Sequence, residues 1–268
     1  MLPTPPLAVL AFLPPPLLAH LRVVLQPNHA LTAYDAWRPF EQAVRESTWD
    51  AVIADPCAEG AVRTDDLVAL IEAYPSTPLT LYSCVSPGTL RSIAELARFG
   101  QGAHPIVLHR IDDEPRRFLE VLERQPANAL SAALLRRLEP GLDQLAPPLA
   151  RAVERLILRP TVFLTAGDLA ASADLTVRTV YRQLAAAGFE SPRTLIVGAR
   201  LLRAYAYSRD PGQSLESVAS RVGYSAPRML TRHMREIVGV TPRAARRRIP
   251  AEEFVSTLAG RLYARRSA

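Results

Sequence analysis

Short, largely apolar runs alternate with amphipathic helical patterns through the first half of the chain, and this alternation limits the folds that it can adopt. Five runs have the length of strands: Leu7–Leu13, Ala30–Tyr34, Ala51–Ala54, Leu79–Cys84 and Pro105–Leu108. Helical periodicity follows each run, at Leu17–Leu25, Trp37–Glu46, Asp65–Ala73, Gly88–Phe99 and Glu114–Arg124. Strands that are apolar on both faces and alternate with helices form parallel sheets covered on both sides. The pattern therefore predicts an α/β domain with a doubly wound, five-stranded parallel sheet.

The carboxyl ends of the strands are where such a sheet places a functional site. In the flavodoxin-like strand order 2-1-3-4-5 that we expect, strands 1, 3 and 4 end side by side at one edge. Asp55 follows the third strand in "DAVIADP", and Ser83 lies near the end of the fourth. In these two positions the chain resembles the receiver domain of response regulators, which carries its phospho-acceptor aspartate and a switch hydroxyl there.

Two departures separate the chain from an ordinary receiver domain. Receivers hold Mg²⁺ with an acidic pair after the first strand, whereas the segment here, "LAVLAFLPPP", contains no acid. Receivers also need a lysine after the fifth strand, and this chain contains no lysine; "VLHR" offers His109 and Arg110. Without these groups the metal lacks oxygen ligands and the phosphoryl charge is not neutralised. We expect a receiver-like domain that is not phosphorylated, and the alternative is a two-component response regulator phosphorylated at Asp55.

Charge is divided unevenly between the two halves of the chain. All 32 basic residues are arginine. Up to Pro126 the chain has 10 arginines and 15 acidic residues, a net charge of −5, and from Ala127 onward it has 22 and 11, a net charge of +11. A strongly basic half predicts a polyanionic partner such as nucleic acid. The missing lysine also excludes a Schiff-base lysine and a P-loop lysine.

Several other classes of protein are disfavoured. The two cysteines, Cys57 and Cys84, exclude a disulfide scaffold, and small residues at the edge of the core are favoured over a redox pair. The uncharged stretch Leu2–Ala19 lacks a basic start and is interrupted by prolines, so we expect a cytoplasmic protein with no membrane partner. The histidines are scattered and no glycine-rich phosphate loop occurs. No enzyme activity, catalytic residue, metal site or cofactor is expected.

The basic half contains two helix-turn-helix patterns. The first, "TAGDLAASADLTVRTVYRQLAAAG" over Thr165–Gly188, begins with a variant capping box, and Thr176 is expected to cap its second helix. The second, "SLESVASRVGYSAPRMLTRHMREIVG" over Ser214–Gly239, has Ser214 and Ser225 as expected caps. A short helix, a tight turn and a second helix with exposed arginines is the signature of helix-turn-helix units.

The residues from about Pro148 to Arg248 resemble the DNA-binding domain of AraC/XylS-type transcription regulators. A long helix over Pro192–Ser208 joins the two units. The residues that carry the resemblance are Thr176 to Arg182, Arg200-Leu201-x-x-Ala204, Ser217-Val218-Ala219, Val222-Gly223-Tyr224-Ser225, Leu230-x-Arg232 and Gly239-x-Thr241-Pro242. The chain departs from the family at Tyr207 and Ser208, where the family has paired leucines, and at Met234, where it has an aromatic residue.

The resemblance implies a DNA-binding site on the second helix of each unit. Two such helices joined by a rigid helix enter successive major-groove segments on one face of the duplex, about 34 Å apart. The expected DNA-binding residues are Arg178, Tyr181, Arg182, Pro227, Arg228, Thr231, Arg232 and Arg235. A further cluster is open to two interpretations, phosphate contact or a solvated surface; it comprises Arg243, Arg246, Arg247 and Arg248.

The sequence as a whole predicts a DNA-binding transcription regulator. The expected parts are a receiver-like domain over 1–126, a helical, proline-containing linker over 127–149, a double helix-turn-helix domain over 150–250 and a C-terminal helix over 251–268. The expected partner is double-stranded DNA. Further candidate partners are a second copy of the chain, bound through the N-terminal domain, and RNA polymerase. The N-terminal domain is expected to serve dimerisation, partner contact or effector sensing.

Overall fold

The computed structural model describes residues 6–25, 29–47, 49–58, 64–74, 76–99, 105–124 and 129–264. Those parts of the predicted segments 1–126, 127–149 and 251–268 that fall outside these ranges are not described. The chain divides into two compact units, one over Pro5–Asn128 and one from Ala129 onward. The hydrophobic clusters of the two units are separate from each other.

The N-terminal unit is built on five parallel strands. They are β1 (Ala8–Phe12), β2 (Ala30–Tyr34), β3 (Ala51–Ala54), β4 (Leu79–Ser83) and β5 (Ile106–Leu108). Their order in the sheet is β2-β1-β3-β4-β5. In this register Phe12 at the end of β1 pairs with Tyr34 of β2 and Ala54 of β3, so these strands end together. The predicted sheet and strand order are confirmed.

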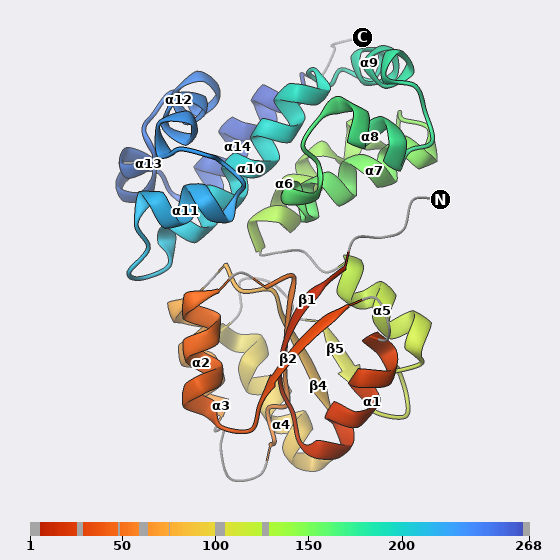
Figure 1. Ribbon diagram of the computed structural model, residues 1–268, viewed down its shortest axis with the longest axis vertical. Coiled ribbons are helices and arrows are strands. Elements are labelled where there is room, and N and C mark those ends of the chain that lie inside the picture. Colours follow the sequence, from red (N-terminus) through yellow and green to blue (C-terminus); the bar gives the residue numbers. More distant parts are fainter. Residues whose placement is uncertain are drawn as a thin grey trace. The chain divides into compact units, whose positions relative to one another are not determined.

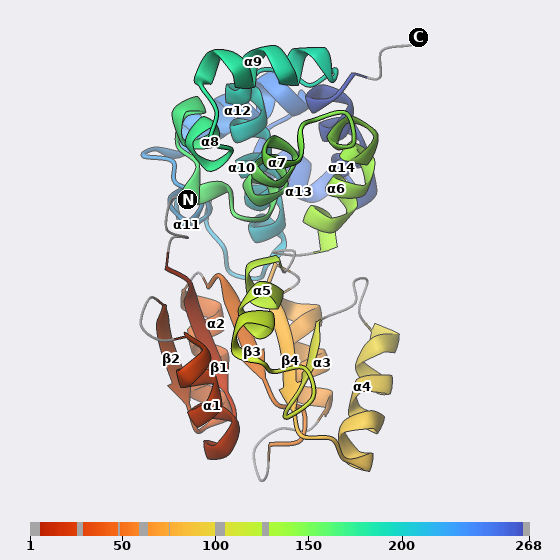
Figure 2. The same cartoon turned by 90° about the vertical axis from the view of Figure 1, so that its right-hand side faces the viewer.

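Helices cover both faces of this sheet (Figures 1 and 2). On one face lie α1 (Pro15–Leu25) and α5 (Pro115–Arg124), and on the other lie α2 (Trp37–Glu46), α3 (Thr64–Ala73) and α4 (Pro87–Phe99). Each face has a separate core. Leu17, Leu21 and Phe118 are buried in the first, and Phe40 and Leu67 in the second. Because the central strands β1, β3 and β4 are buried on both faces, nearly all of their residues are apolar, which explains these runs in the sequence; the edge strands β2 and β5 are less buried.

The C-terminal unit is helical. Its elements are α6 (Ala129–Leu142), α7 (Pro147–Leu158), the 3₁₀ turn η1 (Pro160–Val162), α8 (Ala166–Ser172), α9 (Val177–Ala186), α10 (Pro192–Arg209), α11 (Leu215–Arg221), α12 (Pro227–Val238), α13 (Pro242–Arg248) and α14 (Ala251–Leu262). The long helix α10 contacts α6 to α9 as well as α11 to α14, and it is buried from Leu201 to Tyr207. It is therefore the centre of the unit (Figure 1). None of the helices in the described ranges is long and apolar enough to cross a membrane.

Two segments outside the helix-turn-helix patterns belong to the core of this unit. Residues 127–149 were expected to be a linker, but the described part forms α6 and the start of α7, and Leu134 and Leu138 are fully buried. On α14, Phe254 is fully buried and stacks on Tyr205 of α10, with ring centroids 4.0 Å apart. The helices α10 and α14 approach closely at Gly198, where a Cβ atom would lie 2.6 Å from a methyl group of Leu262. These helices enlarge the core to which both helix-turn-helix units attach.

Candidate nucleic-acid interface

The first helix-turn-helix unit begins with the predicted capping box. Thr165 Oγ1 accepts a hydrogen bond from the Asp168 N–H at 3.3 Å, and Asp168 Oδ2 accepts one from the Thr165 N–H at 2.8 Å. Burial raises the pKa of the Asp168 carboxyl, but hydrogen bonds from the N–H groups of Leu164 and Thr165 and from the Thr165 hydroxyl lower it below its usual value. The ionised carboxylate lies at the amino terminus of α8, where the helix dipole favours negative charge.

The same turn joins the two helices in both units. In the first unit Asp174 has a left-handed backbone, with φ of 54°, and the N–H of the next residue, Leu175, donates to the Ala170 carbonyl at 2.9 Å. In the second unit Gly223 has φ of 79°, and the Tyr224 N–H donates to the Ala219 carbonyl at 2.9 Å. A left-handed residue at this point ends the first helix and redirects the chain. The two helix-turn-helix patterns in the sequence therefore share the same backbone turn.

The caps of the second helices differ. Thr176 accepts a hydrogen bond from the Thr179 N–H at 3.2 Å and caps α9, as predicted. The prediction that Ser225 caps α12 is wrong, because the capping position is Ala226, which provides no side-chain hydrogen bond. The reason is Pro227, which occupies the first turn of α12. A residue before proline is forced into an extended backbone, and Ala226, with φ of −152° and ψ of 141°, therefore lies outside the helix.

Each second helix buries one face and exposes arginines on the other. On α9 the buried pair is Val180 and Leu184, and on α12 it is Leu230 and Met234. The eight predicted DNA-binding residues lie on the rest of these two helices. Those that are exposed are Arg178, Tyr181, Arg182, Arg228, Arg232 and Arg235, and those that are half-buried are Pro227 and Thr231. The structure thus brings them together as two similar surfaces.

Relative to the buried pairs, the arginines occupy the same positions in both units. Arg178 and Arg182 flank Val180 on α9 in the way that Arg228 and Arg232 flank Leu230 on α12. Arg232 Nε lies 3.6 Å from Glu236 Oε1 one turn along α12, but both side chains are more than half exposed. Such an exposed pair contributes little energy and leaves the guanidinium free to bind elsewhere. A planar guanidinium can donate two hydrogen bonds to a guanine edge in the major groove.

The helix α10 connects the two helix-turn-helix units within one core. At its middle, Arg200 Nη2 donates to the Phe163 carbonyl at 3.0 Å and thereby holds the loop before α8. Farther along, Tyr205 donates to the Ile249 carbonyl at 2.7 Å, which holds the end of α13. The same uninterrupted helix also contacts α9 and α12, so both recognition helices pack on one element (Figure 1).

A half-buried contact joins the turn of the second helix-turn-helix unit to its second helix. His233 Nδ1 lies 3.1 Å from the Tyr224 hydroxyl. Burial lowers the pKa of His233, and nearby Arg232, Arg193 and Arg200 lower it further against the opposing charge of Glu236. Burial also raises the pKa of Tyr224 to about 12, so the tyrosine stays neutral.

We predict that this histidine makes the C-terminal unit less stable in mild acid. As pH falls through about 6.5, the unfolded chain binds a proton at His233 before the folded chain does, which favours unfolding. The melting temperature of the native chain should therefore fall more between pH 7.5 and pH 5.5 than that of His233→Gln, which keeps a polar partner for Tyr224. Equal pH dependence in both proteins, measured by calorimetry, would contradict this assignment.

In the N-terminal unit, the predicted edge residue Asp55 is buried and lies directly after β3. Its Oδ1 accepts a hydrogen bond from the Cys57 N–H at 2.9 Å. Burial raises the pKa of this carboxyl, while hydrogen bonds from Cys57 and Ser83 act in the opposite direction. Ser83 is also buried, and its hydroxyl lies 3.2 Å from that of Thr89.

The residues at this edge do not fit the Mg²⁺ ion that receivers use. The chain continues from β1 into Leu13 and Pro14, so the strand beside Asp55 supplies no carboxylate. Among the described residues, no group of three or more His, Cys, Asp or Glu residues is arranged to hold a metal ion. Cys57 is half-buried and Cys84 is exposed, and both thiols are free.

One polar cluster in the N-terminal unit was not predicted from the sequence. Asp113 Oδ2 accepts a hydrogen bond from the Tyr82 hydroxyl at 2.6 Å and lies 2.6 Å from His109 Nδ1, and the Asp113 carbonyl lies 2.8 Å from His20 Nε2. Burial raises the pKa of Asp113, but the hydrogen bonds from Tyr82, His109 and the Arg110 N–H lower it below its usual value. The cluster ties α1 and β4 to the loop after β5.

Comparison with known proteins supports the assignment of the C-terminal unit. Residues 169–248 match the family model of a helix-turn-helix domain. No curated protein matches the chain. Among solved structures, full-length FixJ from B. japonicum is similar, with 16% identity, a TM-score of 0.39 and coverage of 86% of this chain and 97% of that chain. The response regulator RcsB from Salmonella typhimurium has 15% identity, a TM-score of 0.35 and coverage of 72% and 97%.

The architecture of each unit follows from its own helices and strands. Five parallel strands in the order β2-β1-β3-β4-β5, with helices on both faces, give the N-terminal unit a receiver-like fold. The family match begins within α8 and covers α9 to α13 completely. The chain therefore carries, over residues 169–248, a helix-turn-helix DNA-binding domain of the AraC family.

Proposed function

We propose that the chain is a sequence-specific transcription regulator that places α9 and α12 in successive major-groove segments of one DNA duplex. The observation that carries this proposal is the repeated surface: two helices with the same pattern of buried and exposed residues, attached to one continuous helix. Arg178, Arg182, Arg228 and Arg232 are the proposed base-reading residues. Tyr181, Pro227, Thr231 and Arg235 complete the proposed contact surface.

Charge supports a nucleic-acid partner for this half of the chain. From Ala127 onward the net charge is +11. Arginines that contact phosphate release counterions, so the affinity for DNA falls steeply with salt in proportion to the number of phosphate contacts. Base contacts add sequence preference to this general attraction.

Selection of bound DNA from a random pool tests the proposal. The full chain is incubated with the pool at two salt concentrations, and bound molecules are amplified and sequenced. We expect enrichment of a site with two recognisable half-sites about one helical turn apart, and an affinity that falls with salt. Failure to enrich any sequence at either salt concentration would contradict sequence-specific binding.

The N-terminal unit is proposed to act without phosphorylation, as a domain for dimerisation, partner contact or effector sensing. Exposed apolar side chains near β4 and β5 support a contact role; they are Val85, Leu90, Ile106 and Ile111. Exposed apolar groups close to an edge strand favour association with another chain. For a second copy as the partner, sedimentation velocity is the measurement, and a chain that remains monomeric at tens of micromolar would contradict dimerisation.

Treatment with acetyl phosphate and Mg²⁺ separates this proposal from a phosphorylated response regulator. We expect no phosphoryl adduct on the chain, because Asp55 is buried and no acidic pair adjoins it at the end of β1 to hold Mg²⁺. Intact-mass spectrometry makes the measurement, with a known receiver as the positive control. An adduct that is present in the native chain and absent in Asp55→Asn would establish the alternative.

A further inference from the structure

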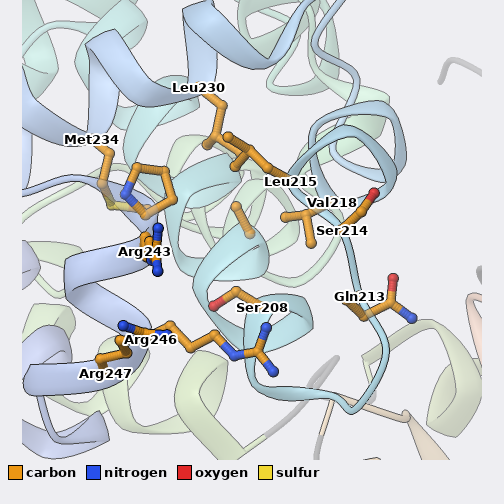
Figure 3. A pocket seen from close by; sticks show the side chains of 12 residues that line it. Ser208, Gln213, Ser214, Leu215, Val218, Leu230, Met234, Arg243, Arg246 and Arg247 are labelled. Atoms are coloured by element: carbon orange, nitrogen blue, oxygen red, sulfur yellow. The ribbon is translucent and has the colours of Figure 1, made fainter.

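The second helix-turn-helix unit contains a cavity of about 570 Å³ between α10, α11, α12 and α13 (Figure 3). This volume lies within the range of sites that bind small organic molecules, which is about 300–1,000 Å³. The cavity lies entirely within the C-terminal unit. Its lining is formed by Ala204, Ser208, Gln213, Ser214, Leu215, Val218, Leu230, Met234, Pro242, Arg243, Arg246 and Arg247.

The two sides of the cavity differ in chemistry. Figure 3 shows Leu215, Val218 and Leu230 together on one side, with the arginines of α13 across from them. Leu215 is 37% exposed and offers most of the accessible apolar surface, while Val218, Leu230 and Met234 also line the cavity but are almost completely buried. The opposite rim carries three arginines, and no acidic residue is among the lining side chains.

Among the described residues, the three arginines of this rim have no partner of opposite charge. In the described part of the chain, none of Arg243, Arg246 and Arg247 forms an ion pair, and all three are exposed. Both Ser208 and Ser214 already make hydrogen bonds within the chain, Ser208 to the Tyr205 carbonyl and Ser214 to the Ser217 N–H. The groups left available to bind a ligand are therefore the positively charged arginines, which lie beside apolar side chains.

The apolar part of the cavity is separate from the proposed base-reading face of α12. Leu230 and Met234 lie on the buried face of α12, and the proposed base-reading residues Arg228 and Arg232 lie on its exposed face. A molecule in the cavity would therefore contact the inner side of the same helix. The apolar lining has no role in reading DNA.

We propose that this cavity binds a small amphipathic organic anion, with its apolar tail against Leu215, Val218 and Leu230 and its carboxylate at the arginines of α13. Guanidinium groups bind carboxylates with charge-assisted and often paired hydrogen bonds. The apolar tail gains free energy by leaving water for the apolar side of the cavity. An inorganic anion has no apolar tail to bury, and an uncharged alcohol has no carboxylate for the arginines to bind.

Methyl resonances of methionine report binding at this place directly. The chain has three methionines, of which Met234 lines the cavity and Met229, on the same helix, does not. The full chain, labelled with ¹³C in the methionine methyl groups, is titrated with decanoate up to about 1 mM. We expect a saturable shift of the Met234 signal and no comparable shift of the Met229 signal. Decanol and inorganic phosphate, tested at the same concentrations, should each bind much more weakly than decanoate.

A matched pair of variants tests the arginine rim. Arg246→Gln removes a lining charge, and Arg248→Gln removes an exposed charge from the same helix that does not line the cavity. We expect Arg246→Gln to weaken decanoate binding about tenfold, the effect of one charge-assisted hydrogen bond, and Arg248→Gln to change it less than twofold.

Three results would overturn the proposal. The first is the absence of a Met234 shift with decanoate. The second is an equal response to decanoate and decanol, which would show that the arginines take no part. The third is equal affinity in Arg246→Gln and Arg248→Gln. A Met234 shift with inorganic phosphate equal to that with decanoate would indicate a simple anion site and would also contradict the proposed amphipathic ligand.

Discussion

A chain in which Arg182 and Arg232 are both replaced by alanine will lose most of its preference for the selected DNA site. The two arginines occupy matching positions on α9 and α12, and each is proposed to read one half-site. Loss of a paired contact from arginine to guanine costs about 1–3 kcal/mol of specific binding. The half-sites are far apart, so the two losses should add to about 2–6 kcal/mol.

The control for this prediction is Arg151→Ala. Arg151 is exposed on α7, so its replacement removes the same charge from the same unit away from α9 and α12. Fluorescence anisotropy with the selected site and with a scrambled duplex gives the specific and non-specific affinities. We expect the double variant to bind the selected site about as weakly as it binds the scrambled duplex. Arg151→Ala should keep its preference for the selected site. A double variant with the native preference would show that other residues read the bases.

Phe254→Ala will destabilise the C-terminal unit by about 3–5 kcal/mol, the usual cost of removing a fully buried phenylalanine. Its ring stacks on Tyr205 of α10, with centroids 4.0 Å apart and planes within 10° of parallel. The substitution removes the ring that holds α14 against the central helix. A loss of this size is a large part of the stability of a typical domain. DNA binding should therefore fail at temperatures where the native chain still binds.

The two units can be followed separately in this experiment. Both tryptophans, Trp37 and Trp49, belong to the N-terminal unit, so their fluorescence reports that unit alone. Urea unfolding of Phe254→Ala should shift the main helical transition in circular dichroism and leave the tryptophan transition unchanged. Thr257→Ala, an exposed change on the same helix, should shift neither by more than about 0.5 kcal/mol. If the helical transition of Phe254→Ala is unshifted, the packing of α14 does not stabilise the C-terminal unit.

Local patterns in the sequence were sufficient to predict much of the fold. The apolar runs that form the central strands β1, β3 and β4 are buried on both sides, and this leaves a strong compositional signal. The capping box at Thr165 and Asp168 and the left-handed glycine at Gly223 act through their immediate neighbours. Features of this kind depend on a few consecutive residues and can therefore be predicted from the sequence.

The features that were missed depend on contacts between distant segments. The cluster around Asp113 joins residues from α1, β4 and the loop after β5, and no spacing in the sequence brings Tyr82 and His20 together. The burial of α6 depends on packing within the C-terminal unit, and its proline and alanines suggested a helical linker. The apolar face of α14 could be read from the sequence, but the surface against which it packs could not. The cap at Ser225 failed for a different reason, because Pro227 displaced the helix start by one residue.

The spacing of the two half-sites tests the central claim most directly. Both recognition helices attach to one continuous helix, α10, so they should tolerate only one separation on the duplex. Insertion of about five base pairs, half a helical turn, between the selected half-sites turns one of them to the opposite face of the DNA. We predict that the affinity then falls to that of a duplex carrying a single half-site. An affinity unchanged by the insertion would contradict the simultaneous binding of α9 and α12 to successive major-groove segments.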